Sequence, residues 1–189
     1  MGNGAGSAKA NAVPSGDANA LTSNTPFNQK EIQVLMKRYS AYDSSYKGEE
    51  GITLADCLTM SEFTGNKFAA SILEAHLDEG TQRIHPKTFF SVLSLLSSKT
   101  PAEVKKNYLF QLVDVYEMGL LTHDEMFRVY KLLFGSAITD DHILDLTYRA
   151  LQHPDLNRPG EISQDEFFRM VPDNEITARL TVDFLLGKT

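Results

Sequence analysis

Apolar residues recur at spacings of three and four along most of the chain, which predicts amphipathic α-helices. Ile32, Leu35, Met36 and Tyr39 give a clear example, because they share one side of a single helix. Helices are expected at about residues 28–42, 67–76, 89–96, 100–114, 123–134, 140–152, 164–171 and 175–186. The predicted fold class is therefore all-α.

Four polar loops, at residues 43–56, 77–88, 114–125 and 155–166, interrupt the helical pattern. Each loop carries one aliphatic residue near its end, namely Ile52, Ile84, Leu121 and Ile162. Short strands at these residues would pair the loops two by two, the first with the second and the third with the fourth. This arrangement predicts two lobes of paired helix-loop-helix units, at residues 27–98 and 99–189, with a C-terminal helix added to the second.

Three of the loops end in residues that can also start the following helix. The pairs are Thr53 with Asp56, Thr122 with Glu125, and Ser163 with Glu166. A hydroxyl residue followed three positions later by an acidic residue can form reciprocal hydrogen bonds at a helix N-terminus. The helix-loop-helix units are therefore expected to form without a bound metal ion.

The fourth loop nearly fits the twelve-residue calcium loop of an EF-hand, which takes oxygen ligands at positions 1, 3, 5, 7, 9 and 12. The candidate ligands are Asp155, Asn157, the backbone carbonyl of Glu161, Ser163 and Glu166. Gly160 stands at the sharp turn, but Pro159 brings no side-chain oxygen to position 5. With only two carboxylates in the shell, we expect at most one weak Ca²⁺ site, with a dissociation constant on the order of 10⁻⁵ M or poorer.

The other three loops depart further from the calcium pattern. The first is two residues too long, and the second has no acidic residue at its first or last position. The third keeps Asp114 and Glu125 at its ends, but Tyr116 and Met118 occupy inner ligand positions. Tight calcium binding is not expected at any of them.

Composition excludes several classes of protein. The 189 residues carry a net charge of -7, and no basic run could replace the counterions of a nucleic acid. The single cysteine, Cys57, cannot form an internal disulfide, so a reducing, cytoplasmic location is expected. The five histidines are scattered, and no phosphate-binding glycine loop follows a predicted strand. We therefore do not expect an enzyme.

Residues 1–26 contain few large apolar side chains and are predicted to be a disordered arm. The start, with Gly2 after the initiator methionine, resembles an N-myristoylation signal, although Gly6 stands where Ser or Thr is preferred. Acylation of Gly2 would add weak membrane association to the cytoplasmic location. The alternative is a plain flexible tail.

With four repeats located, the chain resembles the calcineurin B family, including the calcineurin B homologous proteins that escort sodium/proton exchangers. The resemblance covers about residues 27–186, and its specific stretches are residues 1–3 at the start and residues 108–114, 125–135, 162–167 and 179–185. It implies two EF-hand pairs that clasp an amphipathic helix of a larger protein, such as a phosphatase catalytic subunit, a transporter tail or a scaffold. The function expected is that of a non-enzymatic regulatory or scaffolding subunit with at most weak calcium dependence. The alternative is a calcium-sensing regulatory subunit of a calcineurin-type phosphatase.

A groove for such a helix would use apolar residues of the helices that leave the loops. The candidates are Phe89, Val92, Leu93 and Leu96 in the first lobe, and Phe127, Tyr130, Leu133 and Phe134 in the second. A basic polar face on the partner helix would match the net charge of -7. The C-terminal helix, through Leu180, Phe184 and Leu185, is a candidate lid for this groove. The alternative for each of these residues, taken singly, is that it is an ordinary core residue and not part of a groove.

Overall fold

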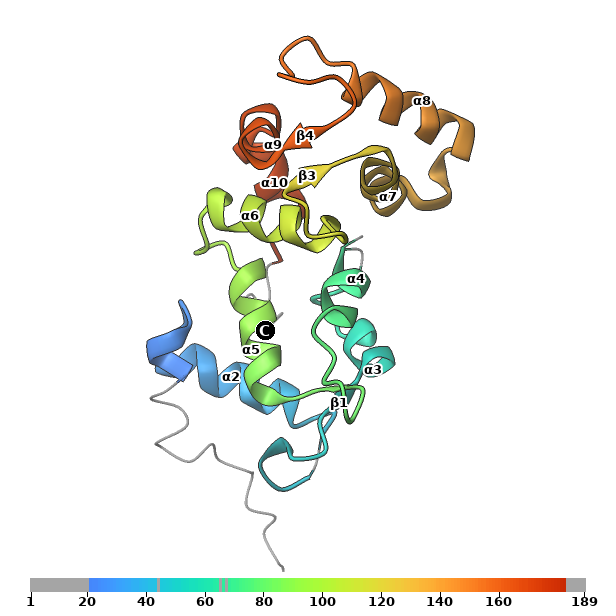
Figure 1. Ribbon diagram of the computed structural model, residues 1–189. Helices are drawn as coiled ribbons and strands as arrows, with labels where there is room; N and C mark the ends of the chain where they lie inside the picture. The colour runs from blue at the N-terminus through green and yellow to red at the C-terminus, as the bar shows by residue number, and fades with distance from the viewer. Residues whose placement is uncertain (1–20, 44, 65, 67, 183–189) are drawn as a thin grey trace, which may run out of the picture.

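The computed structural model describes residues 21–43, 45–64, 66 and 68–182, which are mostly helical (Figure 1). The first half contains α2 (Gln29–Tyr39), a 3₁₀ turn (Tyr46–Gly48), β1 (Ile52–Thr53), α3 (Leu54–Thr59), α4 (Ala69–Glu74), β2 (Arg83–Ile84) and α5 (Pro86–Leu96). The second half contains α6 (Ala102–Val113), β3 (Leu120–Leu121), α7 (His123–Phe134), a 3₁₀ turn (Gly135–Ala137), α8 (Asp140–Leu151), β4 (Ile162–Ser163), α9 (Gln164–Met170) and α10 (Asp173–Arg179). The prediction of an all-α fold is confirmed.

One short antiparallel strand pairing joins the two loops of each half. In the first half β1 pairs with β2, so that Ile52 lies opposite Ile84. In the second half β3 pairs with β4, so that Leu121 lies opposite Ile162. All four side chains are at most 3% exposed. The predicted pairing of the loops is thus confirmed, and it places each pair of aliphatic side chains in the core.

The capping predictions hold at three helices. Thr53 Oγ1 accepts a hydrogen bond from the Asp56 N–H at the start of α3. At α7 the Glu125 carboxylate accepts from the Thr122 N–H at 2.7 Å, and at α9 Glu166 and Ser163 cap each other reciprocally. Because these bonds satisfy N–H groups that the helices cannot satisfy themselves, the loops have an ordered structure of their own.

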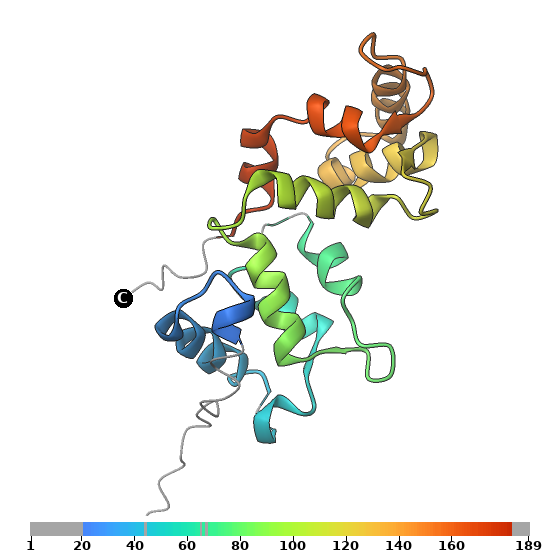
Figure 2. The ribbon, with the colours of Figure 1, turned by 60° about the vertical axis from the view of Figure 1, so that its left-hand side comes forward.

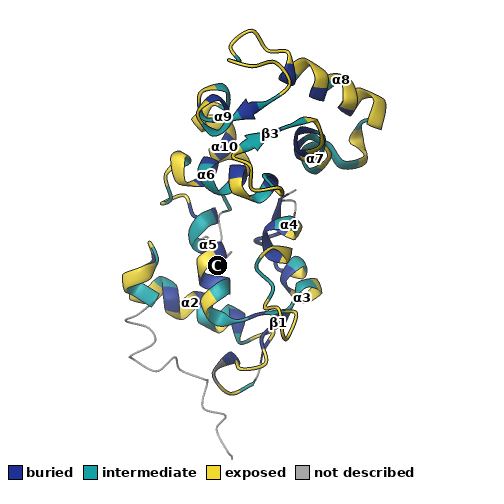
Figure 3. Ribbon diagram, viewed as in Figure 1, coloured by how far each residue is buried: buried dark blue, intermediate teal, exposed yellow. Residues whose placement is uncertain are grey.

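The two halves lie at opposite ends of the molecule, with α5 leading into α6 between them (Figures 1 and 2). Of the buried apolar side chains that the structure describes, all but Ile143 belong to one continuous cluster. Burial is concentrated on the inward faces of the helices, whereas α8 is exposed over most of its surface (Figure 3). Within the stretches that the structure describes, no helix combines the length and apolar character needed to cross a membrane.

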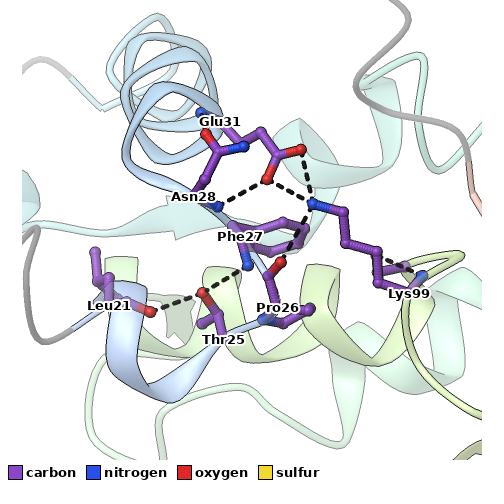
Figure 4. A network of polar contacts seen from close by, with 8 residues as sticks. Leu21, Thr25, Pro26, Phe27, Asn28, Glu31 and Lys99 are labelled. Carbon is purple, nitrogen blue, oxygen red and sulfur yellow. Dashed lines mark hydrogen bonds and ion pairs between the residues drawn. The ribbon is translucent and has the colours of Figure 1, made fainter.

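The predicted arm is too long at its C-terminal end, since residues 21–24 are helical. Leu21 packs against the core, and its carbonyl accepts a hydrogen bond from Thr25 Oγ1 at 2.7 Å. Lys99 Nζ then donates to the Pro26 carbonyl at 3.2 Å and to both carboxylate oxygens of Glu31 (Figure 4). One large apolar side chain and these bonds are enough to order residues 21–26. Gly2 lies outside the described residues.

The C-terminal helix also differs from its prediction at residues 175–186. It begins at Asp173 and ends at Arg179, and Leu180 lies fully buried just after it. The chain then leaves the helical path, and the Val182 N–H donates to the Leu96 carbonyl at 2.9 Å. The helix is therefore shorter than predicted, and Leu180 and Val182 contact the rest of the protein beyond its end. Phe184 and Leu185 lie outside the described residues.

Candidate functional site

The fourth loop is held together by Glu166, its last candidate ligand. One carboxylate oxygen, Oε1, accepts from the Asn157 N–H at 2.6 Å. The other, Oε2, accepts from the Ser163 N–H at 2.8 Å and from Ser163 Oγ at 2.5 Å. These bonds, the Asn157 N–H first, lower the pKa of Glu166 to about 2. Both oxygens that would bind Ca²⁺ are therefore occupied by donors of the loop itself.

The side chains of Asp155 and Glu161 lie beside neighbouring basic groups, and of the two only the Asp155 side chain is a candidate ligand, since Glu161 would contribute its backbone carbonyl. The Asp155 side chain is 77% exposed and lies 3.7 Å from the His153 ring. The Glu161 side chain pairs with Arg158 at 3.0 Å. In the part of the chain that the structure describes, no three Asp, Glu, His or Cys side chains are grouped so that they could share a metal ion. Calcium binding here would require Asp155 to turn inward and Glu166 to exchange its hydrogen bonds.

The third loop presents a different carboxylate environment. Glu125 is fully buried, and its Oε2 accepts from the Thr122 N–H, whereas its Oε1 has no hydrogen-bond partner among the described residues. Asp114, at the other end of the loop, accepts from the N–H groups of Met118 and Gly119 at 3.0 and 2.8 Å. A buried carboxylate oxygen without a donor is destabilising. A cation would satisfy it, but among the described residues Glu125 does not belong to a group of three side chains that could hold one.

In the first two loops the carboxylates are taken up by the loops themselves. Asp43 is buried and accepts from the N–H groups of Ser45 and Gly51 at 2.9 and 2.8 Å. Asp78 accepts from the N–H groups of Gly80 and Thr81 at 3.1 and 2.8 Å. These bonds give both loops the shape that an ion would otherwise impose.

The predicted groove residues divide into two groups. In the first half, Phe89, Val92, Leu93 and Leu96 are at most 1% exposed, because α5 packs them into the core. In the second half, Phe127, Tyr130, Leu133 and Phe134 of α7 are half-buried. The rings of Tyr130 and Phe134 stack with their centroids 6.2 Å apart. The four candidates on α5 are thus core residues in this structure. Of the eight candidates, only the four on α7 keep part of their side chain accessible.

Cys57 is fully buried in α3. Burial raises the pKa of its thiol to about 12, so the reactive thiolate does not form at neutral pH. Cys57 is thus a residue of the helical core and not a reactive thiol.

Two buried lysines of α6 were not singled out from the sequence. Lys105 and Lys106 are 0% and 6% exposed. Lys106 Nζ donates to the Phe168 carbonyl at 3.0 Å and pairs with Asp173 at 2.5 Å. Lys105 Nζ donates to Thr181 Oγ1 at 2.6 Å. The spacing in the sequence does indicate their burial, because both lysines fall on the same helical face as the buried Leu109 and Phe110.

Two pairs of helix-loop-helix units, each joined by a short strand pairing, define the protein as one of EF-hand type. No family model matches the chain. The chain is 25% identical to the calcineurin B subunit of Candida glabrata over 92% of its length and 98% of the relative. For the calcineurin B subunit of Schizosaccharomyces pombe the values are 24%, 86% and 92%, and for the type 1 calcineurin B subunit of Dictyostelium discoideum 25%, 87% and 91%. These similarities support a calcineurin B-like family, as the sequence resemblance predicted.

Proposed function

We propose that the protein is a non-enzymatic regulatory subunit that binds an amphipathic helix of a larger protein. The similarity to proteins named as B subunits of calcineurin extends over nearly the whole chain and supports a role as a subunit. A calcineurin-type phosphatase catalytic subunit is the first class of partner to test, followed by a transporter tail or a scaffold.

The observation that carries this proposal is the apolar row of α7. Phe127, Tyr130, Leu133 and Phe134 are spaced along one helix and remain half-buried, with Tyr130 and Leu133 packed at the edge of the core. A partner helix with apolar anchors would complete the burial of these side chains. Basic residues on its outer face would complement the net charge of -7.

Weak calcium dependence is part of the proposal. The hydrogen bonds of Glu166 and the caps of α7 and α9 give the second half its loop structure without an ion. Ca²⁺, when bound, would supply charge neutralisation to Glu125 or Glu166 and would tighten the loop around it. The unpartnered Oε1 of Glu125 favours the alternative, a calcium-sensing phosphatase subunit.

The test is calorimetric titration of the full-length protein with a synthetic basic amphipathic helix that copies the regulatory-subunit-binding helix of a calcineurin catalytic subunit. Phe134→Glu should weaken binding at least about tenfold, because it places a charge within the apolar contact. Val34→Glu, at an exposed position of α2, is the matched control and should bind as wild type. Equal binding by both variants, with unchanged helical circular dichroism, would contradict the α7 interface.

The same titration tests calcium when it is repeated with a chelator and with excess Ca²⁺. We expect binding in both conditions, with less than about a tenfold difference, since the caps form without the ion. Binding that strictly requires Ca²⁺ and is lost in Glu125→Gln would favour the calcium sensor.

Localisation is proposed to be cytoplasmic, with membrane association only if Gly2 is acylated. Gly2→Ala should then move the protein from the membrane fraction to the soluble fraction. An unchanged distribution would argue against acylation as the anchor.

A further inference from the structure

Arg179, the last residue of α10, and residues 180–182 run along a seam between the two halves, which we define by Asn66, Leu96 and Lys105. Asn66 Nδ2 donates to the Arg179 carbonyl at 3.3 Å. Leu180 is fully buried, and the Val182 N–H donates to the Leu96 carbonyl at 2.9 Å. Figure 2 shows the chain leaving α10 toward the junction of α5 and α6. This short segment therefore contacts both halves.

Lys105 lies at the centre of the seam with few partners. Its side chain is 0% exposed, and in the portion of the chain described its ammonium has one hydrogen bond, to the neutral hydroxyl of Thr181. An ammonium carries three donors, and a buried charge needs compensation. The adjacent Lys106 shows the usual solution, since it pairs with the carboxylate of Asp173. Lys105 is thus a buried positive charge without a carboxylate partner, next to the apolar site that Leu180 fills.

We propose that this seam is a docking site for an extended segment of a partner protein that carries an aliphatic residue followed directly by Asp or Glu. The aliphatic side chain of the partner replaces Leu180, and its carboxylate replaces the Thr181 hydroxyl as the partner of Lys105. Residues 179–182 occupy the site in the free protein. The inference rests on the proposed function, because it gives the partner a second contact besides the α7 row.

Charge complementarity identifies this partner. Residues 179–182 offer the seam one buried leucine and three hydrogen bonds, and the acceptor at Lys105 is a neutral hydroxyl. Hydrogen bonds between an ammonium and a carboxylate are roughly twice as strong as those between neutral groups. A segment with the same backbone contacts and a carboxylate at this position therefore competes with the chain's own residues.

The first experiment compares Thr181→Asp with Thr181→Asn in the full-length protein by thermal unfolding. The two side chains have nearly the same shape and differ in charge, and comparison in the presence and absence of Lys105 isolates the effect of its ammonium. Thr181→Asp should melt about 3–8 °C above Thr181→Asn. In the Lys105→Met background this advantage should disappear. A higher melting temperature for Thr181→Asn in the wild-type background would overturn the proposal.

The second experiment measures docking in trans by NMR. The probe is an acetylated peptide of residues 178–182 with Asp in place of Thr181, and its twin carries Asn there. The full-length protein carries Leu180→Ala to weaken its own segment. The Asp peptide should shift the amide signals of Leu96 and Lys105 and bind about tenfold or more tightly than the Asn peptide. Lys105→Met should remove the difference, and equal or absent binding of both peptides would overturn the proposal.

A third variant, Asp183→Asn, tests whether the chain itself supplies the carboxylate; Asp183 lies outside the described residues. If Asp183→Asn lowers the melting temperature with Lys105 present but not with Lys105→Met, the occupant is internal and the partner proposal is wrong. An unchanged melting temperature supports the partner. Failure of the proposed function is distinguishable, because it would appear as no binding of the amphipathic helix peptide at α7.

Discussion

Replacement of Lys105 by methionine should stabilise the protein at neutral pH and change how its stability depends on pH. Methionine keeps much of the length of the lysine side chain and removes the buried charge. Burial lowers the pKa of the Lys105 ammonium from 10.5 to about 8. The folded protein therefore binds this proton less tightly than the unfolded chain does.

The size of the effect follows from this difference in pKa. A shift from 10.5 to about 8 corresponds to about 3.4 kcal/mol of destabilisation at neutral pH, since each unit is worth about 1.36 kcal/mol. Water penetration and local relaxation reduce such values, and we expect about 1–2 kcal/mol. The loss of the hydrogen bond to Thr181 acts in the opposite direction and lowers the gain further.

The sign of the pH dependence is fixed by linkage. Because the folded-state pKa lies below the unfolded value, the wild type gains stability as the pH rises from about 8 toward 10.5. Between about pH 7 and about pH 9.5 its free energy of unfolding should rise by about 1–2 kcal/mol relative to Lys105→Met. Cys57 and Tyr108, whose pKa values burial raises to about 12, act in the opposite sense but equally in both proteins.

Urea unfolding at several pH values, with both proteins measured side by side, is the assay. The difference between their free energies of unfolding should shrink with increasing pH. A difference that stays constant over this range would show that Lys105 has an ordinary pKa in solution and would refute the reasoning.

Two further substitutions test the loops. Glu166→Gln should remove the part of the stability that depends on the Glu166 carboxylate. The pKa of Glu166 is about 2 in the folded protein, so its hydrogen bonds contribute fully above about pH 4.5 and are lost as the pH falls toward 2. Urea midpoints of variant and wild type should therefore differ at neutral pH and converge at acidic pH. Gly48→Ala should destabilise by about 2–4 kcal/mol, because φ is +73° and the new Cβ would lie 2.7 Å from Pro86 Cγ and 2.9 Å from Tyr39 Cε1. Gly119→Ala is its control in thermal unfolding, since φ is +68° but nothing lies within 4 Å, and an equal loss in both would show that packing at Gly48 contributes nothing.

Sequence periodicity was sufficient for the parts of the fold that depend on local rules. The pairing of Ile52 with Ile84 and of Leu121 with Ile162 followed from one aliphatic residue per loop, and the structure has both pairs in register. The caps at Thr53 and Ser163 followed from residue type and a spacing of three. The caps are specified by neighbouring residues, and the pairings by the repetition of one pattern in each of the four loops.

Features that depend on contacts distant in sequence were not predictable in the same way. After Arg179 the chain leaves α10, Leu180 is buried and Val182 bonds to Leu96, a contact that no local pattern encodes. For the two buried lysines of α6 the helical spacing marks the buried face, but their partners Thr181, Phe168 and Asp173 are more than 60 residues away in the sequence. At the candidate calcium loops, ligand counting favoured Glu166, whereas only the structure shows that the unpartnered oxygen belongs to Glu125.

The contacts of Lys99 give the N-terminal segment a mechanical role. Lys99 follows α5, shortly before α6 begins, and its ammonium holds both the Pro26 carbonyl and the Glu31 carboxylate. Tension on the chain ahead of residue 21 would therefore be transmitted to the connection between the two halves as well as to α2. The side chain of Lys99 thus links the N-terminal segment to the connection that orients the two halves.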